Sequence, residues 1–322
     1  MSKTLCDMLS DPRIAPIAPD AIRNWDLSSE PFWNKTLDEI KAQYFASNLQ
    51  KGFDRLYAAA DTGEWYYPLY SEEECAAVPA RKGTNIVWLP SEVPGADEKP
   101  FILLVPGGGF VNVWNLTEGW PVAAQFNDLG YHVFILTYQV DGEKDLMQKD
   151  LEDCARALKI IADNSKKFHV QADKYITCGF SAGGYLICLW NTAKGYPAFG
   201  LPKPRASFPV YPVTSQKIQI RYEDGDNTDA VRLFGMDLQS AAEKEYEIPE
   251  HAEHFPPTAL FLAAGDDLVD PEHSKMLARS LEKLGIPCKL EIGPEGGHGF
   301  ADGTGMCMAG WTERAVRWYE GL

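Results

Sequence analysis

Residues 175–190, with the sequence YITCGFSAGGYLICLW, decide the fold of this chain. The run at 175–178 is rich in β-branched, aromatic and apolar residues, which is typical of a short buried strand, and the run at 185–190 can open a helix. Between them stands Gly179-Phe180-Ser181-Ala182-Gly183, where glycines two positions before and after the serine permit a tight strand-to-helix turn. A chance GxSxG is common in glycine-rich sequences, so the prediction that Ser181 is a nucleophile depends on this strand-turn-helix context.

Outward from this stretch, short apolar runs alternate with longer segments of helical period from about residue 100 onward. This alternation predicts an α/β fold with a mostly parallel central sheet and helices on both of its faces. The expected strands are residues 101–105, 133–138, 175–178, 206–210, 259–263 and 289–292, with an edge strand at 85–89. The expected helices are residues 147–161, 277–284 and 308–318, because apolar residues recur there at steps of three and four.

The first 83 residues differ from the rest, with prolines near the start and a helical pattern from about 36 to 60. We therefore expect an N-terminal arm or cap at 1–83 and a catalytic domain at 84–322. A charged insertion at about 216–255 is expected to be a solvated loop. Its stretch 223–229, EDGDNTD, suggests calcium, but an EF-hand needs Gly at its sixth position and Glu at its twelfth, where Asp229 and Gly235 stand. We expect no metal and no cofactor.

Composition narrows the function further. The net charge of −16 disfavours nucleic acid and anionic membrane surfaces as partners and favours a neutral small molecule. The chain shows no signal-peptide pattern and no run of about 18 apolar residues, so we expect a cytoplasmic protein. Seven cysteines without CxxC pairs suit reduced, buried thiols. The sequence leaves open whether the chain forms a homo-oligomer.

A serine hydroxyl needs a base, which is usually a histidine. Of the six histidines, His298 fits best, because it follows the last expected strand and its glycine neighbours let a loop carry the ring over the sheet edge. The acid that orients it is expected after the strand at 259–263, where Asp266, Asp267 and Asp270 follow. We favour Asp266, which is nearest the strand end; Asp267 is the alternative, and Asp270 is expected to cap the next helix.

Pro106-Gly107-Gly108-Gly109-Phe110 follows the strand at 101–105. Glycines allow backbone amides to approach a substrate closely, so the N–H groups of Gly108 and Gly109 are expected to join that of Ala182 in an oxyanion hole. The run lacks the lysine of a phosphate-binding loop.

Together these motifs resemble the acetyl-esterase and hormone-sensitive-lipase-like group of α/β-hydrolases, particularly bacterial carbohydrate acetylesterases and feruloyl-esterase-like enzymes. The resemblance covers about residues 84–320. It implies the α/β-hydrolase fold and supports Asp266 as the acid, because the family's acid stands two residues before an apolar pair, here Leu268-Val269, and eight before a helical serine, here Ser274. Two positions depart from the family pattern: Pro106 replaces a histidine, which places the chain nearer the esterases than the lipases, and Gln139 replaces an arginine.

The expected activity is hydrolysis of short-chain acyl or aryl esters, including acetylated or feruloylated carbohydrates, through an acyl-enzyme on Ser181. Phe110, Trp114, Tyr185 and Phe300 adjoin the motifs and are expected to line the substrate pocket, although each can equally be a core residue. Two alternatives stay open. One is an exopeptidase of the prolyl-peptidase type, and the other is a non-catalytic ligand-binding protein with the same fold.

Overall fold

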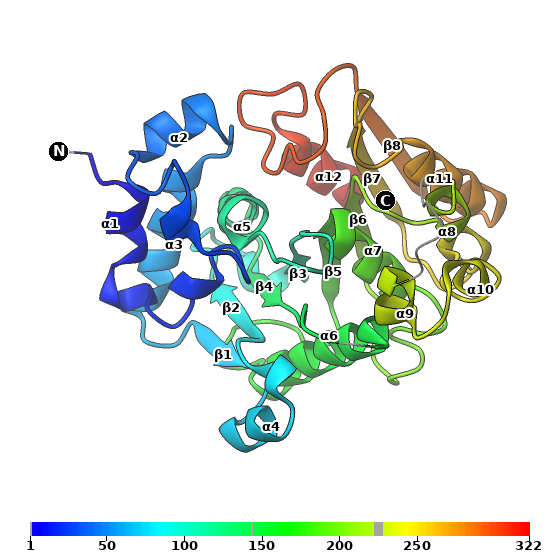
Figure 1. Cartoon of the computed structure of the whole chain (residues 1–322), viewed down its shortest axis with the longest axis horizontal. Helices are drawn as coiled ribbons and strands as arrows, with labels where there is room; N and C mark the ends of the chain where they lie inside the picture. The colour runs from blue at the N-terminus through cyan, green and yellow to red at the C-terminus, as the bar shows by residue number, and fades with distance from the viewer. Residues whose placement is uncertain (1, 143, 222–227) are drawn as a thin grey trace.

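The computed structural model describes residues 2–142, 144–221 and 228–322, and Figure 1 shows one twisted sheet between helical layers. The strands are β1 (Tyr66–Pro68), β2 (Asn85–Leu89), β3 (Phe101–Val105), β4 (Val133–Thr137), β5 (Tyr175–Phe180), β6 (Ala206–Val210), β7 (Thr258–Ala263) and β8 (Cys288–Gly293). Within the described residues they form an eight-stranded sheet in the order β1-β2-β4-β3-β5-β6-β7-β8. The pairs β1–β2 and β2–β4 are antiparallel and the other pairs are parallel, which confirms the predicted α/β class.

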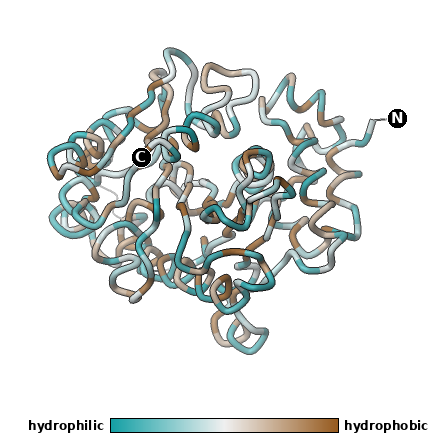
Figure 2. The backbone as a smooth tube through the Cα atoms, turned by 180° about the vertical axis from the view of Figure 1, so that it is seen from behind, coloured by the Kyte–Doolittle hydropathy of each residue, from teal (hydrophilic) through white to brown (hydrophobic). Residues whose placement is uncertain are grey.

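The helices cover both faces of the sheet. They are α1 (Leu5–Leu9), α2 (Leu37–Gln43), α3 (Leu49–Asp61), α4 (Glu72–Ala77), α5 (Trp120–Asp128), α6 (Leu146–Asp163), α7 (Ser181–Trp190), α8 (Gln216–Gln219), α9 (Thr228–Phe234), α10 (Leu238–Ala242), α11 (Glu272–Lys283) and α12 (Trp311–Glu320). Side chains alternate across a strand, so Ile102 and Leu104 of β3 belong to the apolar cluster that contains α3, α5 and α12, whereas Phe101 and Leu103 belong to the cluster that contains α6, α7 and α11. The outer helices are amphipathic, and in Figure 2 apolar and polar residues alternate along their turns.

Three predicted boundaries were wrong. The sheet edge is β1, not residues 85–89, because the three residues Tyr66–Pro68 pair with β2 and are too few to show a period. The helical pattern at 36–60 is two helices, α2 and α3, because the Asn48 side chain accepts the Lys51 N–H and begins a new helix. The last helix starts at Trp311, because Gly310 has φ of 74°.

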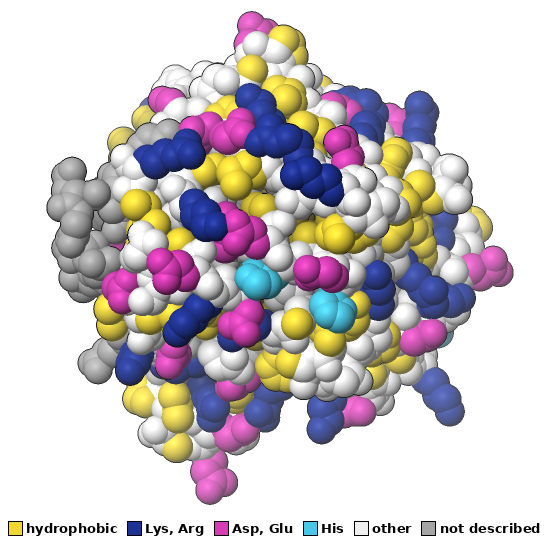
Figure 3. All heavy atoms as spheres, turned by 90° about the vertical axis from the view of Figure 1, so that its right-hand side faces the viewer, with side chains coloured by type: hydrophobic (Ala, Val, Ile, Leu, Met, Phe, Trp, Pro, Cys, Tyr) yellow, Lys and Arg dark blue, Asp and Glu magenta, His cyan; other side chains and the backbone are white. Residues whose placement is uncertain are grey.

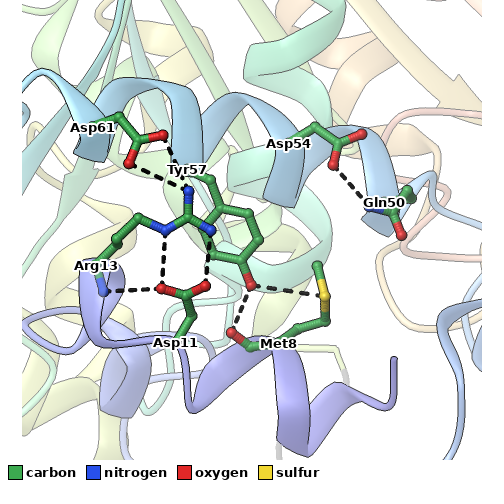
Figure 4. A network of polar contacts seen from close by, with 7 residues as sticks. All are labelled: Met8, Asp11, Arg13, Gln50, Asp54, Tyr57 and Asp61. Carbon is green, nitrogen blue, oxygen red and sulfur yellow. Dashed lines mark hydrogen bonds and ion pairs between the residues drawn. The ribbon is translucent and has the colours of Figure 1, made fainter. Parts of the chain in front are cut away.

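The arm packs against the sheet rather than standing apart from it. Buried side chains of α1, α2 and α3 belong to the same apolar cluster as α5 and one face of the sheet. A polar network joins the start of the arm to α3: Arg13 bonds Asp11 and Asp61 and lies over the Tyr57 ring, whose hydroxyl donates to the Met8 carbonyl (Figure 4). The arm is therefore a fixed wall beside the sheet.

The described residues of the insertion, 216–221 and 228–255, do not form a solvated loop, so the prediction was wrong for them. They contain α8, α9 and α10, and Ala230, Phe234 and Leu238 are buried against the sheet-covering helices. Ala230 and Phe234 lie about one turn apart on α9, and Leu238 begins α10; the surrounding charges obscured these apolar positions in the sequence. The segment 223–227 of the calcium-like stretch lies outside the described residues.

Charged side chains are distributed over the surface. On the face shown in Figure 3, acidic and basic groups are interspersed. No helix in the described ranges is long and apolar enough to cross a membrane. All seven cysteines are free; Cys154, Cys178 and Cys188 are buried as expected, whereas the other four are half-buried.

Candidate active site

The turn between β5 and α7 places Ser181 at the first position of the helix with φ of 49°, a left-handed conformation that costs a non-glycine residue energy. Its neighbours explain the GxSxG spacing. A Cβ on Gly183 would lie 2.2 Å from the Val105 carbonyl oxygen, and a Cβ on Gly179 would lie 2.5 Å from the Gly183 carbonyl oxygen. Only glycine fits at both positions because the opposing atoms are backbone.

Three residues predicted from three separate segments meet at this turn. The Ser181 Oγ lies 2.9 Å from His298 Nε2, and His298 Nδ1 lies 2.8 Å from Asp266 Oδ2. The other carboxylate oxygen of Asp266 accepts the backbone N–H groups of Leu268 and Val269 at 3.1 and 2.9 Å. Its side chain is 1% exposed, so the carboxylate has a single orientation towards the imidazole.

The other carboxylates after β7 lie elsewhere. Asp267 is exposed, and the Asp270 side chain accepts the Glu272 N–H at the start of α11. The residue that directly precedes the helix is Pro271, not Asp270 as predicted. The geometry therefore favours Asp266 over Asp267 as the partner of His298.

The glycine run that follows β3 passes close to Ser181, because a Cβ on Gly107 would lie 2.9 Å from the Ser181 Cβ. Gly108 and Gly109 have φ of 137° and 63°, and a Cβ on Gly108 would lie 2.3 Å from the Asn112 carbonyl oxygen. Within the described part of the chain, neither amide donates to another backbone carbonyl in the loop. The Ala182 amide lies in the first turn of α7, where N–H groups lack intrahelical acceptors. These are the three amides that the sequence predicted for an oxyanion hole.

A cavity of about 700 Å³ opens in front of Ser181 and His298. All four predicted pocket residues line it: Phe110, Trp114, Tyr185 and Phe300. Phe110, Tyr185 and Phe300 are also almost fully buried, so they serve the core and the cavity wall at once, whereas Trp114 is half-buried.

The cavity has two further walls that the sequence pattern did not indicate. One comes from the arm, through Tyr44, Phe45 and Ser47, and the other from α9 and α10 of the insertion. The arm wall is fixed by Asn48, whose N–H donates to Asp302 Oδ2 at 2.9 Å, and Asp302 is fully buried in the loop that carries His298. No local signal in the sequence could reveal this contact, because the two residues are 254 positions apart.

Glu118 and Tyr211 are the other residues at the site that the motifs did not identify. Glu118 lies in a single π-helical turn, η6 (Asn115–Gly119), and lines the cavity although it is buried. Burial raises the pKa of its carboxyl group, while hydrogen bonds from the Gly107 N–H and the Tyr211 hydroxyl oppose that rise. Short π-helical turns are frequent at functional sites, which is the one local signal that could have been sought here.

Within the described ranges, no group of three or more His, Cys, Asp or Glu side chains is arranged to hold a metal ion. The remaining histidines have other surroundings. His273, for example, accepts the backbone N–H groups of Thr214 and Ser215 through Nδ1, both at 3.1 Å, and burial lowers its pKa to about 4.

Several known proteins are similar to this chain in sequence or in fold. The family model BD-FAE matches residues 87–203. An acetylxylan esterase of Xylanibacter ruminicola is 25% identical over 69% of this chain and 45% of its own length, and endo-1,4-beta-xylanase B of Butyrivibrio fibrisolvens is 26% identical over 66% of this chain and 34% of its own. The chain thus spans less than half the length of these two relatives.

A solved structure is similar over a larger share of the chain. The acetyl ester-xyloside bifunctional hydrolase of Caldicellulosiruptor lactoaceticus superposes with a TM-score of 0.65 at 25% identity and covers 80% of this chain and 95% of its own. The carboxylesterase Cest-2923 of Lactobacillus plantarum shares the fold with a TM-score of 0.60 at 19% identity.

Proposed function

We propose that this chain, which has the α/β-hydrolase fold and is similar in sequence to an acetylxylan esterase, is a serine carboxylesterase acting through an acyl-enzyme on Ser181. The observation that carries this proposal is the 2.9 Å contact between Ser181 Oγ and His298 Nε2 at the wall of a cavity. A hydroxyl beside an oriented imidazole is the arrangement that activates a serine for attack on a carbonyl carbon.

The reaction then takes two steps. Ser181 Oγ attacks the ester carbonyl, its proton passes to His298 Nε2, and the amides of Gly108, Gly109 and Ala182 hold the oxyanion. Asp266 stabilises the imidazolium, which then protonates the leaving alcohol as the C–O bond breaks. A water molecule, deprotonated by the same imidazole, attacks the acyl-enzyme and releases the carboxylic acid and free Ser181.

We propose a short acyl group, such as acetyl, on a neutral ring-bearing alcohol, including a carbohydrate; a feruloyl ester is the aryl alternative. The net charge of −16 disfavours polyanionic substrates, and the aromatic side chains along the cavity offer faces on which sugar or phenolic rings can stack. The names of the relatives, an acetylxylan esterase and an acetyl ester-xyloside hydrolase, agree with this substrate class.

The test is hydrolysis of p-nitrophenyl esters of increasing chain length by the wild type and by Ser181→Ala. We expect the acetate to be cleaved faster than longer esters, and Ser181→Ala to lose a factor of about 10⁴ to 10⁶ in kcat. A fluorophosphonate should label the wild type and not the variant, whereas Ser165→Ala, outside the cavity, should behave as the wild type. Equal rates in Ser181→Ala would overturn the proposal, and cleavage of an aminoacyl amide without cleavage of acetyl esters would replace it with a peptidase.

A further inference from the structure

The site is assembled from two loops that approach Ser181 from different sides. The oxyanion loop, residues 106–114, supplies the amides of Gly108 and Gly109, and the histidine loop, residues 294–310, supplies His298. Both steps, formation and hydrolysis of the acyl-enzyme, require these two loops to keep a fixed position relative to each other. A displacement of about 1 Å in a reacting group can lower the rate by a factor of about 100.

Glu118 contacts the first of these loops directly. Its Oε2 accepts the Gly107 N–H at 2.6 Å. Gly107 immediately precedes Gly108, and the Trp114 N–H donates to the Gly107 carbonyl at 3.0 Å. The carboxylate therefore fixes the peptide that leads into the oxyanion amides.

Tyr211 contacts the second loop. Its hydroxyl donates to Glu118 Oε1 at 2.9 Å and accepts the Ala301 N–H at 3.2 Å, three residues after His298. Its ring centroid lies 4.6 Å from that of His298 and 4.8 Å from that of Phe300. Tyr211 itself has φ of 37°, so the chain after β6 adopts a costly conformation to place this ring.

We propose that Glu118 and Tyr211 are positioning residues. Together they form a buried hydrogen-bonded bridge that fixes the distance and orientation of the Gly108 and Gly109 amides relative to His298. This inference rests on the proposed function.

The chain offers a matched control for the tyrosine. Tyr175, at the start of β5 and outside the cavity lining, is 1% exposed, as Tyr211 is. Its hydroxyl also donates one hydrogen bond, to the Pro202 carbonyl at 2.8 Å, and accepts one, from Trp190 Nε1 at 3.0 Å. Tyr211→Phe and Tyr175→Phe therefore each orphan one donor and one acceptor and keep a buried ring.

The experiment measures kcat and KM for p-nitrophenyl acetate, inhibition by phenylboronic acid, and the urea midpoint of unfolding. Tyr211→Phe should lower kcat about 10- to 100-fold with KM within about twofold, because the same amides and imidazole serve both half-reactions. Its affinity for the boronate, whose tetrahedral adduct requires the oxyanion amides, should fall by a similar factor. Tyr175→Phe should shift the urea midpoint comparably and leave kcat within about twofold of the wild type.

Glu118→Gln extends the test. The amide oxygen can still accept the Gly107 N–H, but the amide nitrogen cannot accept the Tyr211 O–H, so kcat should fall as in Tyr211→Phe. The double variant should lose little more than the worse single variant, because both break one bridge. The inference is overturned if Tyr211→Phe keeps the kcat and boronate affinity of the wild type, or if Tyr175→Phe loses as much of both. A wild type that neither cleaves esters nor reacts with a fluorophosphonate would instead refute the proposed function.

Discussion

Replacing Asp266 with Asn separates the two candidate acids and tests how the carboxylate works. Asp266 Oδ1 is held by the N–H groups of Leu268 and Val269, at 3.1 and 2.9 Å, and Oδ2 faces His298 Nδ1 at 2.8 Å. In Asp266→Asn, the two amide donors can be satisfied only by the carbonyl oxygen of the new side chain, which turns its NH₂ group towards His298.

The expected loss of kcat in Asp266→Asn follows from this orientation of the amide. An NH₂ group donates to Nδ1, so the imidazole carries its proton on Nε2 and cannot accept the proton of Ser181. Wrong-tautomer substitutions of this kind cost a factor of about 10⁴ in kcat. That factor corresponds to about 5.5 kcal/mol of transition-state stabilisation.

The assay compares kcat and kcat/KM for p-nitrophenyl acetate in Asp266→Asn and Asp267→Asn, with thermal unfolding as the control for folding. Asp267 is exposed, so its variant should keep kcat within about twofold of the wild type. A folded Asp266→Asn enzyme with more than a tenth of the activity, or a loss confined to Asp267→Asn, would refute the assignment of Asp266.

Two further predictions concern stability. Gly183→Ala should lower the free energy of unfolding by about 1–3 kcal/mol and abolish activity, because its Cβ would meet the Val105 carbonyl at 2.2 Å. Urea titration checks this, and Gly142→Ala, where a Cβ meets only flexible side-chain ends, should stay within about 0.5 kcal/mol of the wild type. Burial lowers the pKa of His273 from 6.5 to about 4. As the pH falls, the unfolded chain therefore binds a proton at this residue before the folded chain does. The free energy of unfolding should fall by up to about 3 kcal/mol between about pH 6.5 and pH 4. His273→Asn keeps an acceptor for the backbone amides and should flatten this dependence; identical urea midpoints for the wild type at pH 7 and pH 5 would contradict the prediction.

Much of the sheet and the triad candidates could be predicted from the sequence. Buried parallel strands are continuous apolar runs, so β3 to β7 were visible as such. β8 is only half-buried, and Lys289 and Glu291 interrupt its apolar residues. The glycine spacing around Ser181 is a local steric requirement. Ser181, Asp266 and His298 each follow a parallel strand, and the carboxyl ends of these strands meet at one edge of the sheet, so the three side chains could be expected to lie together. Where the signal was weak, as in the three-residue β1 or the charged residues around α9, the prediction was wrong.

The sequence by itself thus determined the fold class and the chemical groups beside Ser181, because those depend on periodicity and on spacing within short segments. Only the tertiary structure decided what surrounds them. Tyr211 bonds Glu118, 93 positions away in the sequence, and Asp302 bonds Asn48 of the arm, 254 positions away. Each contact is a single hydrogen bond, so it produces no periodic pattern in either segment. Such contacts depend on where the packed elements bring two backbones together, which local patterns do not specify.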